Sequence, residues 1–274
     1  MLLDLVRKVV PINVRQDVGL WAVGKVASSK FLAYPFFYLL CGEIPKGLKT
    51  LPGGKCSITY NGYEITSPRD GLFTFIEVLQ DEVYEKLGSP KERDVVLDIG
   101  AYVGMFTLKV ANLVGKSGMV IPIEPSPTNL SYLKQNVNHL GNVKIVEEAI
   151  LDRIGEGKLY LSSASPCHSL VYPHKDFLKV KVNTLDNLAK QLNLPHVDFI
   201  KIDIEGAELQ ALEGARGILT KNNIRCAIAS YHTLPNGTPE LPQIINFFQS
   251  VGYHYKIIDK YVYAERKGSQ EKYG

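Results

Sequence analysis

Residues 95–107, which read VVLDIGAYVGMFT, decide the fold class. The first part of this stretch, 95–99, is almost wholly apolar and predicts a buried strand. Gly100 permits a tight turn after the strand, and Gly104 lets the next segment pack closely against it. Helical apolar spacing then begins at residue 105. A strand that leads through a glycine turn into a helix is the opening half of a parallel α/β unit.

The same alternation continues toward the C-terminus. Ser126 and Pro127 have the residue types of an N-cap and a first helical position. Further strands are predicted at 119–123, 143–146, 180–182, 199–202 and 226–230, and further helices after Ser126 and at 184–191, 207–219 and 241–251. This pattern predicts an α/β fold with a mainly parallel sheet and helices on both faces.

The N-terminal third lacks this alternation. Residues 1–50 indicate short helices, and Asn61-Gly62 between two alternating segments predicts a β-hairpin. Residues 73–87 have the apolar spacing of an amphipathic helix. The predicted organisation is therefore a helical cap and hairpin extension over 1–90, an α/β domain over 91–265 and a flexible tail over 266–274.

The ends of the first two strands predict a nucleoside site. Gly100 and Gly104 have G-x-x-x-G spacing, which is not the dinucleotide fingerprint. Asp98 beside this turn would repel a pyrophosphate but suits a ligand with an ammonium group. Glu124 ends the second strand, where a carboxylate can accept hydrogen bonds from ribose hydroxyls. Together these features favour S-adenosylmethionine over NAD, and either Glu147 or Glu148 could contact the adenine.

With these residues in view, the chain resembles the FkbM-type family of S-adenosylmethionine-dependent methyltransferases. The matching segments are VVLDIGAYVGMFT, IPIEPSPTNLSYLKQN, VNTLDNL and VDFIKIDIEGAELQALEGA, of which KIDIEGAE is the most diagnostic. The resemblance covers residues 94–232 and implies a Rossmann-like class I methyltransferase fold. It also implies transfer of a methyl group to a hydroxyl of a sugar, polyketide or other metabolite. Tyr102 departs from the family pattern, which usually has Asn there.

The predicted cofactor-binding residues lie in or after these strands. They are Asp98, Gly100, Tyr102, Gly104, Glu124, Pro125, Glu148 and Asp203.

The acceptor side is predicted at the ends of the strands 199–202 and 226–230. His232 is our first expectation for the general base and Asp203 the second. Lys201 lies within an apolar strand, so we expect it to pair with Asp203 or Glu205 and to join the catalytic group. Glu205 and Glu208 could equally be acids at a helix N-terminus.

The loop 162–176, SSASPCHSLVYPHKD, is a candidate for acceptor contacts because loops on a rigid scaffold often supply them. The predicted substrate residues are Ser169, His168 and Glu205. No metal site is predicted, because Asp203, Glu205 and Glu208 do not share a helical face and the histidines of the loop match no zinc pattern.

The net charge and the length of the apolar runs limit which classes of partner the chain is expected to bind. The chain has 274 residues and a formal net charge of +3, which is too small to indicate nucleic acid binding. The longest apolar run, FLAYPFFYLLC at 31–41, is too short to span a bilayer. We expect a cytoplasmic protein whose aromatic N-terminal segment packs as a cap or contacts the inner membrane surface. The oligomeric state is left open.

The leading function is O-methylation of a small molecule, sugar or glycan. An RNA or protein methyltransferase on the same fold is the alternative, although no N-P-P-Y-type motif follows Ile202. A catalytically inactive S-adenosylmethionine-binding module is a third reading, which the set of strand-end carboxylates disfavours. An NAD-dependent oxidoreductase is disfavoured by the glycine spacing.

Overall fold

The computed structural model describes residues 48–71, 73–162 and 164–266. They fall into two compact units, Met1–Glu82 with Ser163–Cys167, and Val83–Ser162 with His168–Gly274. The cap predicted over 1–50 lies outside the described residues as far as residue 47, and so does the tail beyond Arg266. Among the residues that are described, no helix is long and apolar enough to cross a membrane.

The described part of the first unit contains an antiparallel sheet. Its strands are β1 (Lys49–Leu51), β2 (Lys55–Tyr60) and β3 (Tyr63–Pro68), in the order β1-β2-β3. Asn61 and Gly62 both have positive φ, 47° and 82°, and Tyr60 pairs directly with Tyr63 across the turn. The predicted hairpin is confirmed, because Asn-Gly tolerates the left-handed conformation that a two-residue hairpin turn needs.

The helix predicted over 73–87 is wrong in its extent. The structure has a short α4 (Phe73–Phe75), followed by one π-helical turn, η3 (Ile76–Gln80). Glu82 then takes a positive φ of 49°, a conformation that no α-helix can contain. The remaining described helical turns of this unit are the 3₁₀ segments η1 (Pro52–Gly54), η2 (Arg69–Gly71) and η4 (Ser165–Cys167).

The second unit is built on a central sheet, for which the described residues give the strand order β11-β12-β10-β9-β4-β5. The strands are β4 (Val95–Ile99), β5 (Met119–Ile123), β9 (Phe199–Ile202), β10 (Arg225–Ala229), β11 (Tyr253–Ile258) and β12 (Tyr261–Arg266). Neighbouring strands are parallel from β5 to β10, whereas β12 is antiparallel to both of its neighbours. The chain order reverses between β4 and β9, which is where open sheets of this kind bind ligands.

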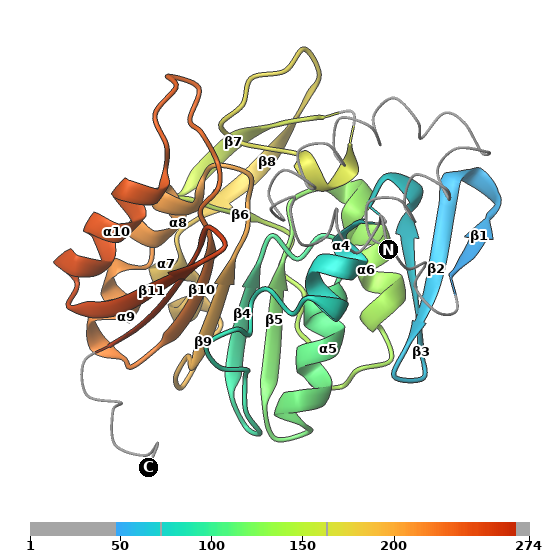
Figure 1. Cartoon of the computed structure of the whole chain (residues 1–274), viewed down its shortest axis with the longest axis horizontal. Coiled ribbons are helices and arrows are strands. Elements are labelled where there is room, and N and C mark those ends of the chain that lie inside the picture. The colour runs from blue at the N-terminus through green and yellow to red at the C-terminus, as the bar shows by residue number, and fades with distance from the viewer. Residues whose placement is uncertain (1–47, 72, 163, 267–274) are drawn as a thin grey trace, which may run out of the picture. The chain divides into compact units, whose positions relative to one another are not determined.

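Helices cover both faces of this sheet (Figure 1). One group is α5 (Met105–Val114) with α6 (Pro127–Val137), and the other comprises α7 (Leu185–Gln191), α8 (Glu208–Glu213), α9 (Arg216–Lys221) and α10 (Leu241–Ser250). The Ser126 side chain accepts a hydrogen bond from the Asn129 N–H, and Pro127 begins α6, as predicted. The α/β fold with helices on both faces of a mainly parallel sheet is confirmed.

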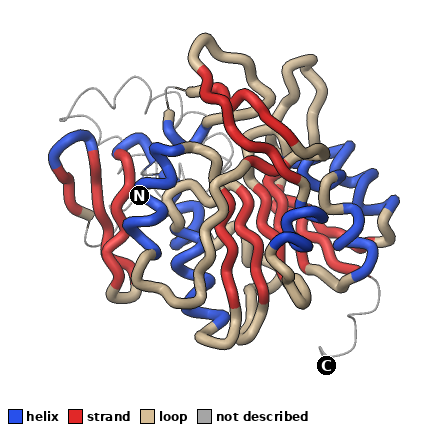
Figure 2. Tube along the Cα trace, turned by 180° about the vertical axis from the view of Figure 1, so that it is seen from behind, coloured by secondary structure: helices blue, strands red, loops and turns tan. Residues whose placement is uncertain are grey.

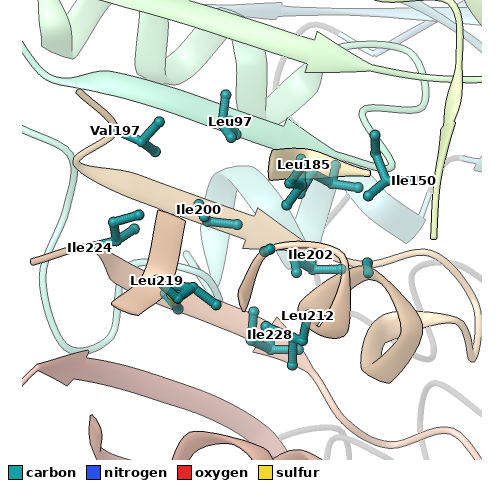
Figure 3. Close-up of a cluster of buried hydrophobic side chains, with 14 of the residues drawn as sticks. Leu97, Ile150, Leu185, Val197, Ile200, Ile202, Leu212, Leu219, Ile224 and Ile228 are labelled. Atoms are coloured by element: carbon teal, nitrogen blue, oxygen red, sulfur yellow. The ribbon is translucent and has the colours of Figure 1, made fainter. Parts of the chain in front are cut away.

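A buried core joins the sheet to the second helix group (Figure 3). Leu97, Ile200 and Ile228, on β4, β9 and β10, belong to one buried cluster with Leu212 and Leu219 of the helices. Burial of these apolar side chains fixes how the three strands are aligned with one another. It therefore also fixes the positions of the residues that follow their carboxyl ends.

The helix predicted over 207–219 is in fact two helices, α8 and α9. The Asp186 carboxylate accepts hydrogen bonds from the backbone N–H groups of Gly217 and Ile218, at 2.8 and 2.7 Å. These bonds satisfy donors that begin a new helix, so the chain bends before α9. The strand predicted over 143–146 is reduced to two isolated bridges with β5, Val120–Val143 and Ile123–Val146.

A second, smaller sheet in this unit has the order β6-β8-β7 in the described residues. Its strands are β6 (Ala149–Ile150), β7 (Gly155–Tyr160) and β8 (Phe177–Asn183). β6 follows soon after Val146, which pairs with the last residue of β5, so this sheet begins at the carboxyl end of the central sheet. Figures 1 and 2 show it beside that end from both sides.

The close approach of Gly100 to β9 generates a stability prediction. Gly100 has a φ of +78°, and a Cβ added there would lie 1.9 Å from the Asp203 carbonyl oxygen. Gly100→Ala is therefore expected to reduce the free energy of unfolding by about 2–4 kcal/mol, measured by urea denaturation of the full chain. Gly141→Ala is the matched control, because a Cβ there has no neighbour within 4 Å and φ is not positive. Equal stability of the two variants would refute the assigned role of Gly100.

Candidate active site

The carboxyl ends of β4 and β9 are joined by a buried ion pair. Lys201 Nζ lies 3.2 Å from Asp98 Oδ1, and these residues are only 4% and 0% exposed. The same ammonium donates to the carbonyl oxygen of Gly100 at 2.7 Å, and Thr107 donates to Asp98 Oδ2 at 2.6 Å. The expected pairing of Lys201 with Asp203 or Glu205 is therefore wrong. The reason is the register, which places Asp98 directly beside Lys201 in neighbouring strands.

This pairing changes the role that the sequence indicates for Asp98. Its carboxylate is wholly buried and is neutralised by Lys201, so it is not the group that an incoming ammonium would meet. Asp98 and Lys201 instead hold the glycine turn, residues 100–104, against β9. We therefore assign both residues a positioning role.

The glycine turn presents its backbone at the edge of the sheet. Gly100 and Ala101 donate their N–H groups to the Ile123 carbonyl, and Tyr102 has a φ of +53°. Asn tolerates this left-handed conformation better than Tyr does, which accounts for the usual residue of the family pattern. A Cβ on Gly104 would lie 2.6 Å from the Leu133 side chain, so α5 starts in contact with α6.

Glu124 is fixed at the end of β5 and faces this turn. It is 5% exposed and accepts hydrogen bonds from Tyr102 N–H at 3.0 Å and from Ser126 N–H at 2.9 Å. The Asn129 side-chain amide donates to it at 3.3 Å. Burial raises the pKa of Glu124 to about 7, although the two backbone hydrogen bonds and Asn129 oppose that effect.

The Asp203 carboxylate lies at the end of β9, on the other side of the glycine turn. Its backbone N–H donates to Ile99, the last residue of β4. Its side chain accepts hydrogen bonds from the Tyr84 hydroxyl at 2.5 Å and from the Tyr231 hydroxyl at 3.4 Å. Asp203 is half-buried, which leaves its carboxylate open to a ligand at this edge.

A buried acid–histidine group adjoins Asp203. His232 follows β10, and its Nδ1 lies 3.3 Å from Glu208 Oε1 while its Nε2 lies 3.4 Å from Glu205 Oε2. Glu205 has a positive φ of 57°, and its carbonyl accepts from the Ser169 hydroxyl at 2.6 Å. Glu240 is fully buried before α10 and accepts from the Leu209 N–H.

The proximity of these charges shifts their pKa values in opposite directions. Burial alone would lower the pKa of His232, but the Glu208 and Glu205 carboxylates outweigh it and raise that pKa well above its usual value. For Glu208 burial acts in the other direction and would raise the pKa, but the nearby His232 outweighs it and lowers that pKa to about 2. Burial and the nearby Glu208 charge together raise the pKa of Glu240 to about 9. The group therefore contains acids with very different proton affinities, as functional sites often do.

The other predicted residues lie around this edge. Ser169 is buried, and its hydroxyl also accepts from the Val171 and Tyr172 N–H groups, so it holds the loop of Glu205 in place. His168 Nδ1 accepts from the Ser162 N–H. Glu148 is half-buried and accepts from the Asn183 amide, whereas Glu147 is exposed and pairs with Lys134. Pro125 is half-buried directly after Glu124.

Sequence reasoning missed Tyr84, Tyr231 and Glu240. Tyr84 was predicted to lie within a helix, and no local pattern shows that its hydroxyl meets a residue far along the chain. Tyr231 could have been found, because it precedes His232 after the same strand. Glu240 gives no sequence signal, since its environment depends on where α10 packs.

The residues at the β4 and β5 ends fit S-adenosylmethionine. A carboxylate has about four acceptor positions, and the hydrogen bonds of Glu124 use only part of them. It can therefore accept from ribose hydroxyls without losing its protein contacts. Gly100 and Gly104 let the turn pack closely against Asp203 and Leu133, which fixes the backbone between them beside Glu124.

Comparison with known proteins finds a local match to a curated enzyme. Over 86 residues the chain is 35% identical to the tRNA (cytosine(72)-C(5))-methyltransferase of Pyrococcus horikoshii, a match to 31% of this chain and 22% of that enzyme. The chain thus spans about a fifth of the length of this curated relative.

Two solved structures show weaker likeness over longer spans. Methyltransferase FkbM from Methylobacillus flagellatus KT is 18% identical, with a TM-score of 0.46 over 92% of this chain and 59% of that one. Aeropyrum pernix fibrillarin, solved with S-adenosyl-L-methionine bound, is 13% identical, with a TM-score of 0.45 over 82% of this chain and 84% of that one.

The family assignment rests on a longer match. The model of the methyltransferase FkbM domain matches residues 98–255, more than half of the chain, from Asp98 through the acid–histidine group to β11. S-adenosylmethionine is accordingly the expected cofactor, in agreement with the fit at Glu124 and the glycine turn. The chain belongs to the FkbM family of methyltransferases.

Proposed function

We propose that this methyltransferase transfers the methyl group of S-adenosylmethionine to a hydroxyl oxygen of a small molecule, sugar or glycan. One observation carries the proposal: the half-buried Asp203 carboxylate lies beside the glycine turn, with the acid–histidine group behind it. A hydroxyl is a weak nucleophile that must lose a proton, and carboxylates at this position can receive it.

The cofactor, when bound, supplies a methyl group on a positively charged sulfur. The chain itself binds the ribose through Glu124, holds the glycine turn beside that carboxylate, and orients the acceptor hydroxyl toward Asp203. Asp203 is the stronger candidate for the proton acceptor, because both ring nitrogens of His232 already face carboxylates. His232 then holds Glu205 and Glu208 at the acceptor side.

RNA remains the alternative acceptor, favoured by the local match to a tRNA methyltransferase. The charges at the acceptor side support the small-molecule proposal instead. Asp203, Glu205 and Glu208 would bring negative charge close to a phosphate backbone, which nucleic acid sites avoid. RNA binding that weakens steeply with salt would favour the alternative.

The cofactor role of Glu124 predicts a pH dependence. With a pKa of about 7, the carboxylate ionises between pH 6 and pH 8, and the ionised form accepts hydrogen bonds from ribose hydroxyls best. The affinity for S-adenosylhomocysteine, measured by calorimetric titration, is expected to rise about tenfold over this range. Because the pKa of Glu124 is raised from 4.5 in the unfolded chain to about 7 in the folded chain, the free energy of unfolding falls as the pH rises from about 4.5 to about 7.

Glu124→Gln separates charge from shape. The amide cannot ionise, so affinity at pH 8 is expected to fall by about 10- to 100-fold and to lose its pH dependence. Glu156→Gln is the control, because Glu156 is an exposed acid in β7 and is not among the residues assigned to the cofactor site. A Glu124→Gln variant with normal affinity would contradict the assignment.

Asp203→Asn tests the methyl transfer itself. Transfer of labelled methyl from S-adenosylmethionine to a panel of hydroxylated acceptors is expected to fall by about 10²–10⁴-fold if Asp203 receives the proton. The exposed Glu156→Gln serves as a control for charge removal. Detection of the label only on nitrogen or carbon of the product, or undiminished transfer in Asp203→Asn, would refute the proposal.

A further inference from the structure

Three side chains from separate segments converge at the acceptor side. Asp203 comes from the end of β9, Glu208 from the first turn of α8 and His232 from the loop after β10. One ligand atom from each of them lies within 4.8 Å of the other two. The expectation of no metal weighed Asp203, Glu205 and Glu208 together and the histidines of the loop 162–176 separately, and it did not combine the acids with His232. The fold instead adds His232, which the sequence places far from the acids.

Both ring nitrogens of the histidine in this group face carboxylates. His232 is 8% exposed, and neither of its ring nitrogens makes a hydrogen bond with the described residues, although carboxylate oxygens lie near both. A cation between His232 and Glu208 would satisfy the ring nitrogen and the carboxylate at the same time.

The spacing of one ligand pair, His232 and Glu208, fits a shared ion. Metal–nitrogen and metal–oxygen bonds are about 2.1 Å long, so two ligands of a tetrahedral or octahedral ion lie about 3.0–3.4 Å apart. His232 Nδ1 and Glu208 Oε1 are 3.3 Å apart. A charge-assisted hydrogen bond between the same groups would instead be about 2.7–2.9 Å.

The surrounding residues would orient these ligands. Glu205 Oε2 lies 3.4 Å from His232 Nε2, on the side of the ring away from Nδ1, which is the arrangement of a carboxylate behind a metal-bound histidine. Glu208 Oε1 accepts from the Ile204 N–H at 2.9 Å. The Tyr84 hydroxyl holds Asp203 Oδ2. Each of the three side chains is thus fixed by a neighbour.

We propose that Asp203, Glu208 and His232 bind a divalent cation. One imidazole and two carboxylates suit an ion that accepts both nitrogen and oxygen, such as Mn²⁺ or Zn²⁺. The two carboxylates balance the charge of the ion. A second part of the proposal rests on the proposed function. The free coordination positions of the ion bind the hydroxyl oxygen of the acceptor, and the cation makes that hydroxyl more acidic.

Mn²⁺ alone is the first probe. Full-length protein, stripped with a chelator, is titrated with Mn²⁺, and the free ion is followed by electron paramagnetic resonance. We expect one bound ion per chain, and at least tenfold weaker binding in Glu208→Gln and His232→Ala. If wild-type protein binds no Mn²⁺ even when the ion is added at millimolar concentration, the site is overturned, whatever the variants do.

His196→Gln is the matched control. His196 lies 3.1 Å from Asp198 but is half-exposed on the surface, so its loss is expected to leave Mn²⁺ binding unchanged. Equal weakening by His196→Gln and His232→Ala would also overturn the assignment. Co²⁺ absorption of the wild-type protein gives a second readout, because ligand-field bands report nitrogen and oxygen ligation without any variant.

Parallel assays distinguish this proposal from the proposed function. Mn²⁺ binding that is lost in His232→Ala supports the site even if no acceptor hydroxyl is methylated. Methyl transfer that is undiminished after chelation would overturn the role of the ion toward the acceptor and leave the proposed function standing. Calorimetry with S-adenosylhomocysteine checks that each variant keeps its folded cofactor site.

Discussion

The buried ion pair between Lys201 and Asp98 is the interaction on which the rest of the site depends. It joins the two strands at which the chain order reverses, and its ammonium also holds the carbonyl of Gly100. Removing one partner of such a pair leaves an uncompensated buried charge, which typically costs about 3–5 kcal/mol. The glycine turn, and through Tyr102 the Glu124 carboxylate, are therefore placed by a contact that itself touches neither proposed ligand.

A second constraint is the accumulation of buried acids at the acceptor side. Glu208 and Glu240 are fully buried, and Glu205 and Asp203 lie close by, with His232 as the partner of two of them. So much negative charge is tolerated inside a protein only when protons, cations or hydrogen-bond donors offset it. In the chain by itself, a proton on His232 offsets part of this buried negative charge. A divalent cation held by the same side chains would offset it as well, and it would add chemistry that a proton cannot supply.

Much of the second unit could be predicted from the sequence, because its strands are continuous apolar runs bounded by glycine, proline or acids. β4, β5 and β9 have the predicted bounds, and Glu124 and Asp203 lie at strand ends as expected. The partner of Lys201 could not be predicted, since it depends on the register between β4 and β9. The break between α8 and α9 depends on Asp186 from another helix, and β11 and β12 carry too many polar residues to form a clear apolar run.

The most direct test of this account is a double-mutant cycle on the ion pair, read as the affinity for S-adenosylhomocysteine. Lys201→Met and Asp98→Asn each leave one buried charge unpaired, so each is expected to weaken binding at least tenfold by displacing the glycine turn. The double variant has no unpaired charge, and its loss is expected to be smaller than the product of the single losses, with a coupling free energy above about 1 kcal/mol. Single variants that bind as the wild type does, or losses that simply multiply, would contradict the claim that this pair organises the cofactor site.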